Sequence, residues 1–185
     1  MNKEVVILNR ERNVSLTVYL LDVGGEFPAI AKRPLVLVLP GGGYQFCSDR
    51  EADPVALSYL KAGYHAAILR YSVAAYADWP NPLDDYDQAM EFLKGKSEEW
   101  NIYADRIAVI GFSAGGHLAA AAATMARNRP AAAILGYAVA GEDVKGCSPT
   151  APDTVSAVDG QTPPCFLFHT RNDNVVPVMN SVRFM

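Results

Sequence analysis

From residue 35 onward, short apolar runs alternate with longer segments in which apolar residues recur at helical spacing. Strands are predicted over Leu35–Leu39, His65–Tyr71, Ile107–Ile110, Ala132–Tyr137 and Cys165–Phe168. Helices are predicted between them, over Asp53–Ala62, Pro82–Gly95 and His117–Ala126. This alternation indicates an α/β fold with a mostly parallel, doubly wound sheet and helices on both faces.

The N-terminal segment, a late polar segment and the C-terminal segment follow other patterns. Val5–Leu8 is apolar and Ser15–Leu20 alternates apolar and polar residues, which predicts an antiparallel N-terminal edge of the sheet. Residues 141–162 are rich in Pro, Ser, Thr, Gly and Asp and are predicted to form a long polar loop. Residues 177–185 look like a helix that has just begun, with no capping signal at its end. We therefore expect one domain over residues 1–185 that is C-terminally incomplete.

Composition narrows the classes of partner. The chain has 185 residues, of which half are hydrophobic, and a net charge of −4. Without a run of lysine or arginine, nucleic acid and anionic membranes are not expected as partners, and no apolar run approaches the length of a membrane span. The charged N-terminal stretch is unlike a signal peptide, so a cytoplasmic location is expected. The three cysteines are widely spaced and indicate neither a disulfide framework nor a zinc site.

A serine lies at the turn between a predicted strand and a predicted helix. Ser113 stands between Gly111 and Gly115, directly after Ile107–Ile110. This G-x-S-x-G pattern is typical of a nucleophile elbow, in which glycines allow a tight turn that exposes the serine hydroxyl at the N-terminus of a helix. The alternative is an ordinary glycine-rich turn that carries a surface serine.

A second glycine cluster, Gly41–Gly43, ends the strand Leu35–Leu39. Acyl transfer needs backbone N–H groups close to the carbonyl oxygen that becomes negative, and we assign this oxyanion role to Gly42, Gly43 and Ala114. A phosphate-binding loop is the alternative. No Lys-Ser or Lys-Thr pair follows the glycines, however, and the G-x-G-x-x-G spacing of a dinucleotide site is absent.

An acidic residue follows the last predicted strand, Cys165–Phe168. Asp173 occupies the place where an acid that orients a catalytic histidine would lie, and it comes after the serine in the chain. Its alternative role is to cap the following turn.

Taken together, these motifs resemble those of the α/β-hydrolases, and within them the small carboxylesterases of the hormone-sensitive-lipase and acetyl-xylan-esterase kind. The matching segments are Pro40–Tyr44, Leu69–Tyr71, Pro82–Asp85, Trp100–Ile107, Gly111–His117 and His169–Pro177. Many members carry a histidine where Pro40 stands. The resemblance implies a sheet that lacks its last strand and helix here, leaving an exposed edge beside Cys165–Phe168 through which a homodimer could form.

The resemblance also implies a catalytic histidine on a loop after one further strand, beyond Met185. The chain has three histidines, and we expect none of them to be the general base: His65 lies within a predicted strand, His117 on the first turn of a helix, and His169 at the end of a strand. A serine hydroxyl is a weak nucleophile until a base takes its proton. The 185 residues are therefore expected to hold an incomplete triad.

The resulting hypothesis is a serine hydrolase that cleaves short-chain carboxylic esters, with acetylated sugars as candidate substrates, using Ser113, Asp173 and the oxyanion groups. No metal or organic cofactor is required, and the expected partner is a small-molecule ester. Two alternatives stay open: a non-catalytic, hydrolase-like binding protein, and a peptidase of the prolyl-oligopeptidase type. The glycine-rich oxyanion loop argues against the peptidase.

Overall fold

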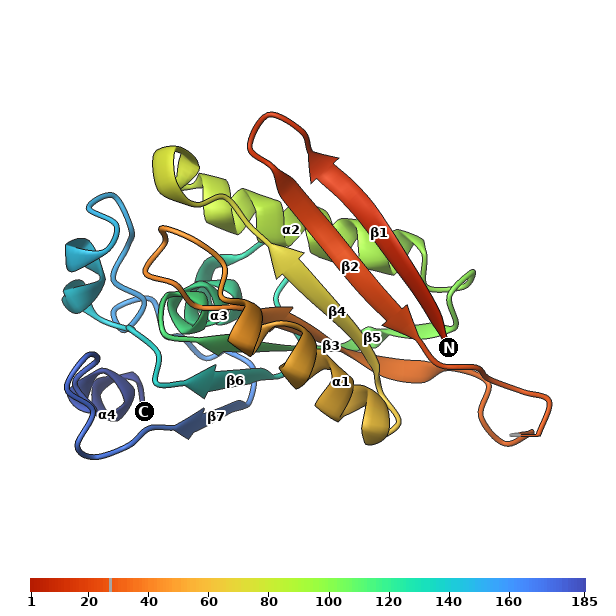
Figure 1. The fold of residues 1–185 in the computed structure, drawn as a ribbon. Coiled ribbons are helices and arrows are strands. Elements are labelled where there is room, and N and C mark those ends of the chain that lie inside the picture. The colour runs from red at the N-terminus through yellow and green to blue at the C-terminus, as the bar shows by residue number, and fades with distance from the viewer. Residues whose placement is uncertain (27) are drawn as a thin grey trace.

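The computed structural model describes residues 1–26 and 28–185, and its centre is one sheet of seven strands in the order β1-β2-β4-β3-β5-β6-β7 (Figure 1). The strands are β1 (Asn2–Asn9), β2 (Val14–Leu20), β3 (Arg33–Leu39), β4 (His65–Arg70), β5 (Ile102–Phe112), β6 (Ala133–Gly136) and β7 (Cys165–Phe168). The β1–β2 and β2–β4 pairs are antiparallel and the remaining pairs are parallel. The predicted α/β fold with an antiparallel N-terminal edge is thus confirmed.

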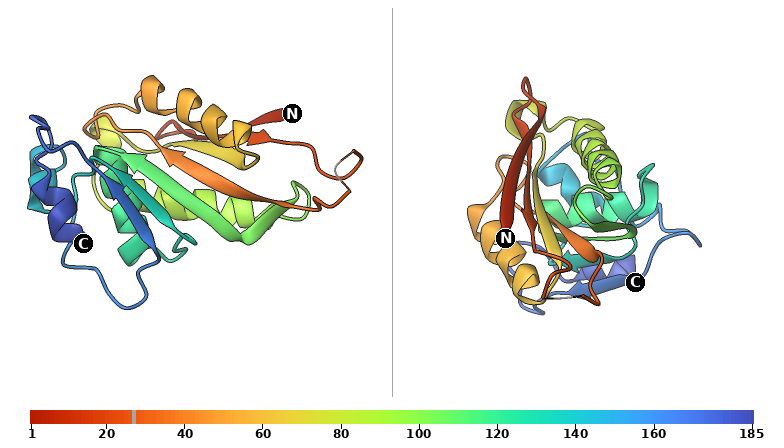
Figure 2. Two further views of the ribbon diagram at one scale, coloured as in Figure 1. Left: turned by 90° about the horizontal axis from the view of Figure 1, so that it is seen from below. Right: turned by 90° about the vertical axis from the view of Figure 1, so that its right-hand side faces the viewer.

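In the described part of the chain, four α-helices accompany the sheet: α1 (Asp53–Lys61), α2 (Asn81–Gly95), α3 (Ala114–Met125) and α4 (Met179–Phe184). Figure 2 shows α1 on one face of the sheet and α2 and α3 on the other. The core has two corresponding halves, a smaller one beneath α1 and a larger one beneath α2 and α3. Strands β3 and β4 are buried from both sides, which explains their continuous apolar sequences. Within the described residues, no helix is long and apolar enough to cross a membrane.

The two elements on either side of Ser113 begin earlier than the sequence predicts. Strand β5 begins at Ile102 rather than Ile107, because residues 102–106 continue the strand although three of them are exposed. Helix α3 begins at Ala114 rather than His117, because the small residues that follow the serine are themselves the first turn of the helix. The polar segment 141–162 contains only the short 3₁₀ helix η3 (Glu142–Gly146) among its regular elements.

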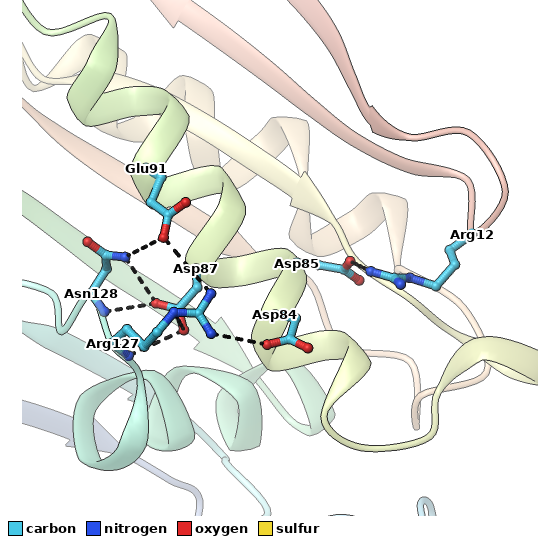
Figure 3. Close-up of polar contacts among 7 residues, drawn as sticks. All are labelled: Arg12, Asp84, Asp85, Asp87, Glu91, Arg127 and Asn128. Atoms are coloured by element: carbon cyan, nitrogen blue, oxygen red, sulfur yellow. Dashed lines mark hydrogen bonds and ion pairs between the residues drawn. The ribbon is translucent and has the colours of Figure 1, made fainter.

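Buried carboxylates attach α2 to its surroundings (Figure 3). Asp85 is fully buried and accepts hydrogen bonds from the Arg12 guanidinium at 2.5 Å and from the backbone N–H of Ser72 at 2.8 Å. Asp87 accepts the backbone N–H of Asn128, just past the end of α3, at 2.8 Å. A buried carboxylate is stable only when such donors satisfy it. These contacts fix α2 against the end of β4, the β1–β2 hairpin and α3.

The loops that follow β3, β5, β6 and β7 meet at the carboxyl edge of the parallel strands. Open α/β sheets bind ligands at this edge. The loop after β3 is anchored by the segment that follows β4. The Tyr71 hydroxyl donates to the Pro40 carbonyl at 2.6 Å, and the Ala74 N–H donates to the Tyr44 carbonyl at 2.7 Å. The packing of the fold therefore presents the glycine cluster, the serine and Asp173 on one side of the sheet.

Candidate active site

Ser113 lies at the apex of the turn between β5 and α3, with backbone angles φ 53° and ψ −118°. A non-glycine residue in this region is strained, and such strain is typical of a nucleophile elbow. The flanking glycines are required by space: a Cβ on Gly111 would stand 2.1 Å from the Gly115 carbonyl oxygen, and one on Gly115 would stand 2.2 Å from the Leu39 carbonyl oxygen. The turn is closed by the Ser113 N–H, which donates to the Gly136 carbonyl at 3.0 Å.

The glycine loop after β3 adopts conformations that other residues avoid. Gly42 has φ 136° and Gly43 has φ 61°, and a Cβ on Gly42 would stand 2.1 Å from the Phe46 carbonyl oxygen. Within the described part of the chain, the N–H groups of Gly42, Gly43 and Ala114 have no hydrogen-bond acceptor. Gly41 differs, because its N–H is bonded to a side chain. The N–H groups of Gly42, Gly43 and Ala114 are thus free to donate, and their oxyanion role stays a prediction.

Asp173 lies on the loop after β7. Its Oδ1 accepts the backbone N–H groups of Val175 and Val176, both at 2.8 Å. These two bonds, together with the nearby His169, lower the pKa of Asp173 below its usual range, so the side chain is an anion at neutral pH. Asp173 therefore caps its own turn, and it also lies at the candidate site. Among the described residues, Oδ2 has no hydrogen-bond donor and lies 3.7 Å from His169 Nε2, so it has the capacity to accept a hydrogen bond.

A cleft of about 530 Å³ brings most of the predicted residues together. Gly42, Gly43, Ser113 and Asp173 all line it. Ala114 lies next to Ser113 in the chain but its side chain is buried, so only its backbone N–H bears on the site. A second hollow of about 200 Å³ also reaches Ser113 and is walled by residues from the 141–162 segment and the Asp173 loop.

Both ring nitrogens of each of the three histidines are hydrogen-bonded to groups other than Ser113. His65 accepts the Leu21 N–H and bonds the Asn101 carbonyl, and burial lowers its pKa. His117 is fully buried, bonded to Tyr44 and to the Pro152 carbonyl. His169 bonds the Ser181 hydroxyl at 2.7 Å and donates to the Val176 carbonyl at 2.8 Å.

Comparison with known proteins agrees with this architecture. A family model described as BD-FAE matches residues 21–133, and one described as Phospholipase/Carboxylesterase matches residues 84–185. Each covers more than half of the chain. The chain belongs to the α/β-hydrolase family of carboxylesterases.

Individual proteins match between 58% and 98% of this chain. The crystal structure of MGS-M1, an α/β hydrolase enzyme from a Medee basin deep-sea metagenome library, is 48% identical, with a TM-score of 0.90 over 98% of this chain and 74% of that one. Endo-1,4-beta-xylanase B of Butyrivibrio fibrisolvens is 30% identical over 83% of this chain and 29% of its own length. The acetylxylan esterase of Xylanibacter ruminicola is 32% identical over 58% of this chain and 23% of its own. The chain thus spans less than a third of the length of these two curated relatives.

The structure of this α/β hydrolase adds polar groups to the cleft that the sequence motifs did not indicate. Arg50, Glu51 and Tyr137 all line the cleft. Burial and the hydrogen bond to Glu51 raise the pKa of Tyr137 above its usual range, so its hydroxyl stays a donor at working pH. Tyr137 ends a predicted strand at the carboxyl edge, and that position is the only signal the sequence offers. The described residues contain no group of three or more His, Cys, Asp or Glu side chains arranged to hold a metal ion.

Proposed function

We propose that the protein hydrolyses short-chain carboxylic esters by acyl transfer to Ser113, with acetylated carbohydrates as the candidate substrates. The observation that carries the proposal is that one cleft is lined by a serine in the strained elbow conformation, by glycines with free N–H groups, and by the Asp173 carboxylate. Acetyl esters of xylan are candidates because a relative is an acetylxylan esterase. The hollow of about 200 Å³ beside Ser113 suits a small acyl group.

In the proposed reaction, Ser113 Oγ attacks the ester carbonyl carbon while a base takes its proton. The carbonyl oxygen becomes an oxyanion that accepts hydrogen bonds from the N–H groups of Gly42, Gly43 and Ala114. Collapse of this intermediate expels the alcohol, which receives the proton from the base and leaves an acyl-serine. Water then attacks the acyl group in the same way, releasing the acid and restoring the Ser113 hydroxyl.

We propose that the base is a histidine outside residues 1–185, oriented by Asp173. Two observations support this assignment. The side-chain nitrogens of His65, His117 and His169 are all committed to other groups. Asp173 Oδ2, in contrast, lies at the cleft with room for an incoming N–H, while Oδ1 holds its own loop in place.

Hydrolysis of p-nitrophenyl acetate tests the proposal. We would compare the 185-residue chain with the protein from the full reading frame of its gene, each beside its Ser113→Ala variant. Ser156→Ala is the matched control, because Ser156 is exposed and its hydroxyl donates to the Asp153 carbonyl, away from the cleft residues. We expect Ser113-dependent turnover in the full-length protein, faster for the acetyl than for the octanoyl ester. Strong turnover by the 185 residues alone would place the base within the chain, with His169 the first residue to replace.

A non-catalytic binding protein is the second candidate, favoured by the commitment of all three histidines. If no sample hydrolyses the ester but both lengths of protein bind acetylated xylo-oligosaccharides by calorimetry, this candidate is supported. Ser113→Ala would then leave the affinity nearly unchanged.

A further inference from the structure

Glu51 connects two of the loops that surround Ser113. It ends the short 3₁₀ helix η1 (Asp49–Glu51). Its Oε2 accepts the backbone N–H of Gly41 at 2.7 Å, and its Oε1 accepts the hydroxyl of Tyr137 at 2.7 Å. One carboxylate thus joins the glycine loop after β3 to the loop after β6.

The carboxylate lies close to the nucleophile elbow as well. The point where a Cβ on Gly41 would stand is 2.7 Å from Glu51 Oε2 and 3.1 Å from Ser113 Cβ. The same point is 2.7 Å from the Phe112 carbonyl oxygen. The acid, the glycine loop and the elbow therefore converge on Gly41, and only a residue without a side chain fits there.

The bond to Glu51 fixes the residue that directly precedes Gly42 and Gly43. Gly41 is pinned on both sides of its Cα, because its N–H is bonded to Glu51 and its carbonyl accepts the Ser48 N–H at 2.8 Å. The next two glycines have positive φ and no acceptor for their N–H groups among the described residues. Glycine segments have the greatest conformational freedom of any sequence, so they need an external contact to hold one geometry.

A negative charge this close to Ser113 also affects the stability of the oxyanion that forms in the reaction. An oxyanion forming beside Ser113 is disfavoured by a nearby carboxylate unless that carboxylate is neutralised by donors. Glu51 is satisfied by two of them, and a hydrogen bond to a charged acceptor is shorter and stronger than one to a neutral acceptor. The arrangement therefore favours rigidity of the glycine loop.

We infer that Glu51 is a positioning residue of the ester-hydrolysis site: it holds Gly41 and Tyr137 so that the N–H groups of Gly42 and Gly43 point into the cleft. The inference rests on the proposed function. It predicts that Glu51 affects the rate of the chemical step through the glycine loop, without touching the substrate.

Three variants and a matched control test this role in the full-length protein. Glu51→Ala removes both bonds, and Glu51→Gln keeps an oxygen for Gly41 without the charge. Tyr137→Phe removes only the hydroxyl. Asp49→Ala is the control, because it removes an exposed carboxylate from the same short helix, where Asp49 pairs with Arg70 and not with the glycine loop.

For p-nitrophenyl acetate, we expect Glu51→Ala to lower kcat by about 10–100-fold with KM changed by less than about threefold, because the interaction matters in the transition state. Glu51→Gln should recover most of the loss, and Asp49→Ala should match the parent protein. Unchanged kcat in Glu51→Ala, or a loss that follows thermal stability and is not rescued by Gln, would overturn the inference.

The Gly41 amide signal in ¹H–¹⁵N spectra provides a readout that does not need turnover. A short bond to a carboxylate should place this proton far downfield, with a smaller shift in Glu51→Gln and a normal position in Glu51→Ala. An identical Gly41 signal in the parent protein, Glu51→Gln and Glu51→Ala would contradict the inference. Absence of Ser113-dependent hydrolysis with the expected amide shifts would instead count against the proposed function alone.

Discussion

The hydroxyl of Tyr44 lies 2.7 Å from Nδ1 of His117, and both side chains are fully buried. Nε2 of the same ring lies 2.9 Å from the Pro152 carbonyl oxygen, which can only accept, so Nε2 carries the hydrogen. Nδ1 is then the acceptor and Tyr44 the donor. His117 is thereby held neutral, and it joins the glycine loop, α3 and the 141–162 segment.

This arrangement predicts a loss of stability in mild acid. Burial lowers the pKa of His117 to about 4 from the ordinary value of 6.5, so between these values the unfolded chain binds a proton that the folded protein does not. The contribution of His117 to the free energy of unfolding should therefore be fully present above pH 6.5 and should be lost as the pH falls toward 4. Between pH 7 and pH 5 the loss should be about 2 kcal/mol.

Urea unfolding at pH 7 and pH 5 measures the effect, and His117→Gln should show a smaller difference between the two pH values than the parent protein. The ring signals in NMR provide an independent check. They should remain those of a neutral imidazole down to pH 5. Titration of His117 near pH 6.5 would refute the prediction.

The glycines of the elbow should tolerate no side chain. A Cβ on Gly115 would stand 2.2 Å from the Leu39 carbonyl oxygen and 2.4 Å from that of Pro40, and backbone atoms cannot move aside cheaply. We expect Gly115→Ala to lower the free energy of unfolding by about 3 kcal/mol or more. Gly95→Ala is the contrasting control, because nothing lies within 4 Å of its Cβ position in α2 and it should stabilise the protein by about 0.5–1 kcal/mol. Equal effects of the two substitutions in urea unfolding would argue against this account.

The β7 edge of the sheet should promote self-association of the 185-residue chain. Among the strands that the structure describes, β7 has a neighbour on one side only, and Phe166 on it is 65% exposed. An apolar strand with an unpaired edge pairs readily with a second copy. We expect a dimer or larger species in light scattering, reduced by Phe166→Lys. Leu57→Lys replaces a similarly exposed apolar residue on α1 and should leave the association unchanged. A monodisperse monomer would contradict this proposal.

The parts of the molecule that the sequence predicts are those encoded locally. The elbow around Ser113 needs small residues at fixed offsets, and Asp173 needs only to follow a strand, so both positions can be read from short segments. The sequence pattern places the start of α3 three residues late because glycines normally disfavour a helix, whereas here Gly115 and Gly116 permit close packing against neighbouring backbone and Ala138.

Contacts between distant segments cannot be predicted in this way. The Glu51 carboxylate reaches Gly41 and Tyr137, and Tyr137 is 86 residues away in the chain. No spacing rule relates a residue of a 3₁₀ helix to the end of a later strand. The placement of both residues in the cleft follows only from the order of the strands, which brings the loops after β3 and β6 to either side of β5.

The substitution Asp173→Asn separates the two roles of this residue. The carbonyl oxygen of the introduced amide could still accept the N–H groups of Val175 and Val176, which Asp173 Oδ1 holds at 2.8 Å, so the loop should keep its fold and its thermal stability. The amide nitrogen, however, would present donors to the proposed histidine where the carboxylate presents an acceptor, favouring the wrong tautomer. In the full-length protein we expect kcat for p-nitrophenyl acetate to fall by about 10³–10⁴-fold, as in other triads.

Asp153→Asn is the matched control, because Asp153 accepts the Val155 N–H at 2.9 Å in a similar turn that does not line the cleft. A fall of less than about tenfold for Asp173→Asn would mean that Asp173 only caps its loop, and that another group orients the base.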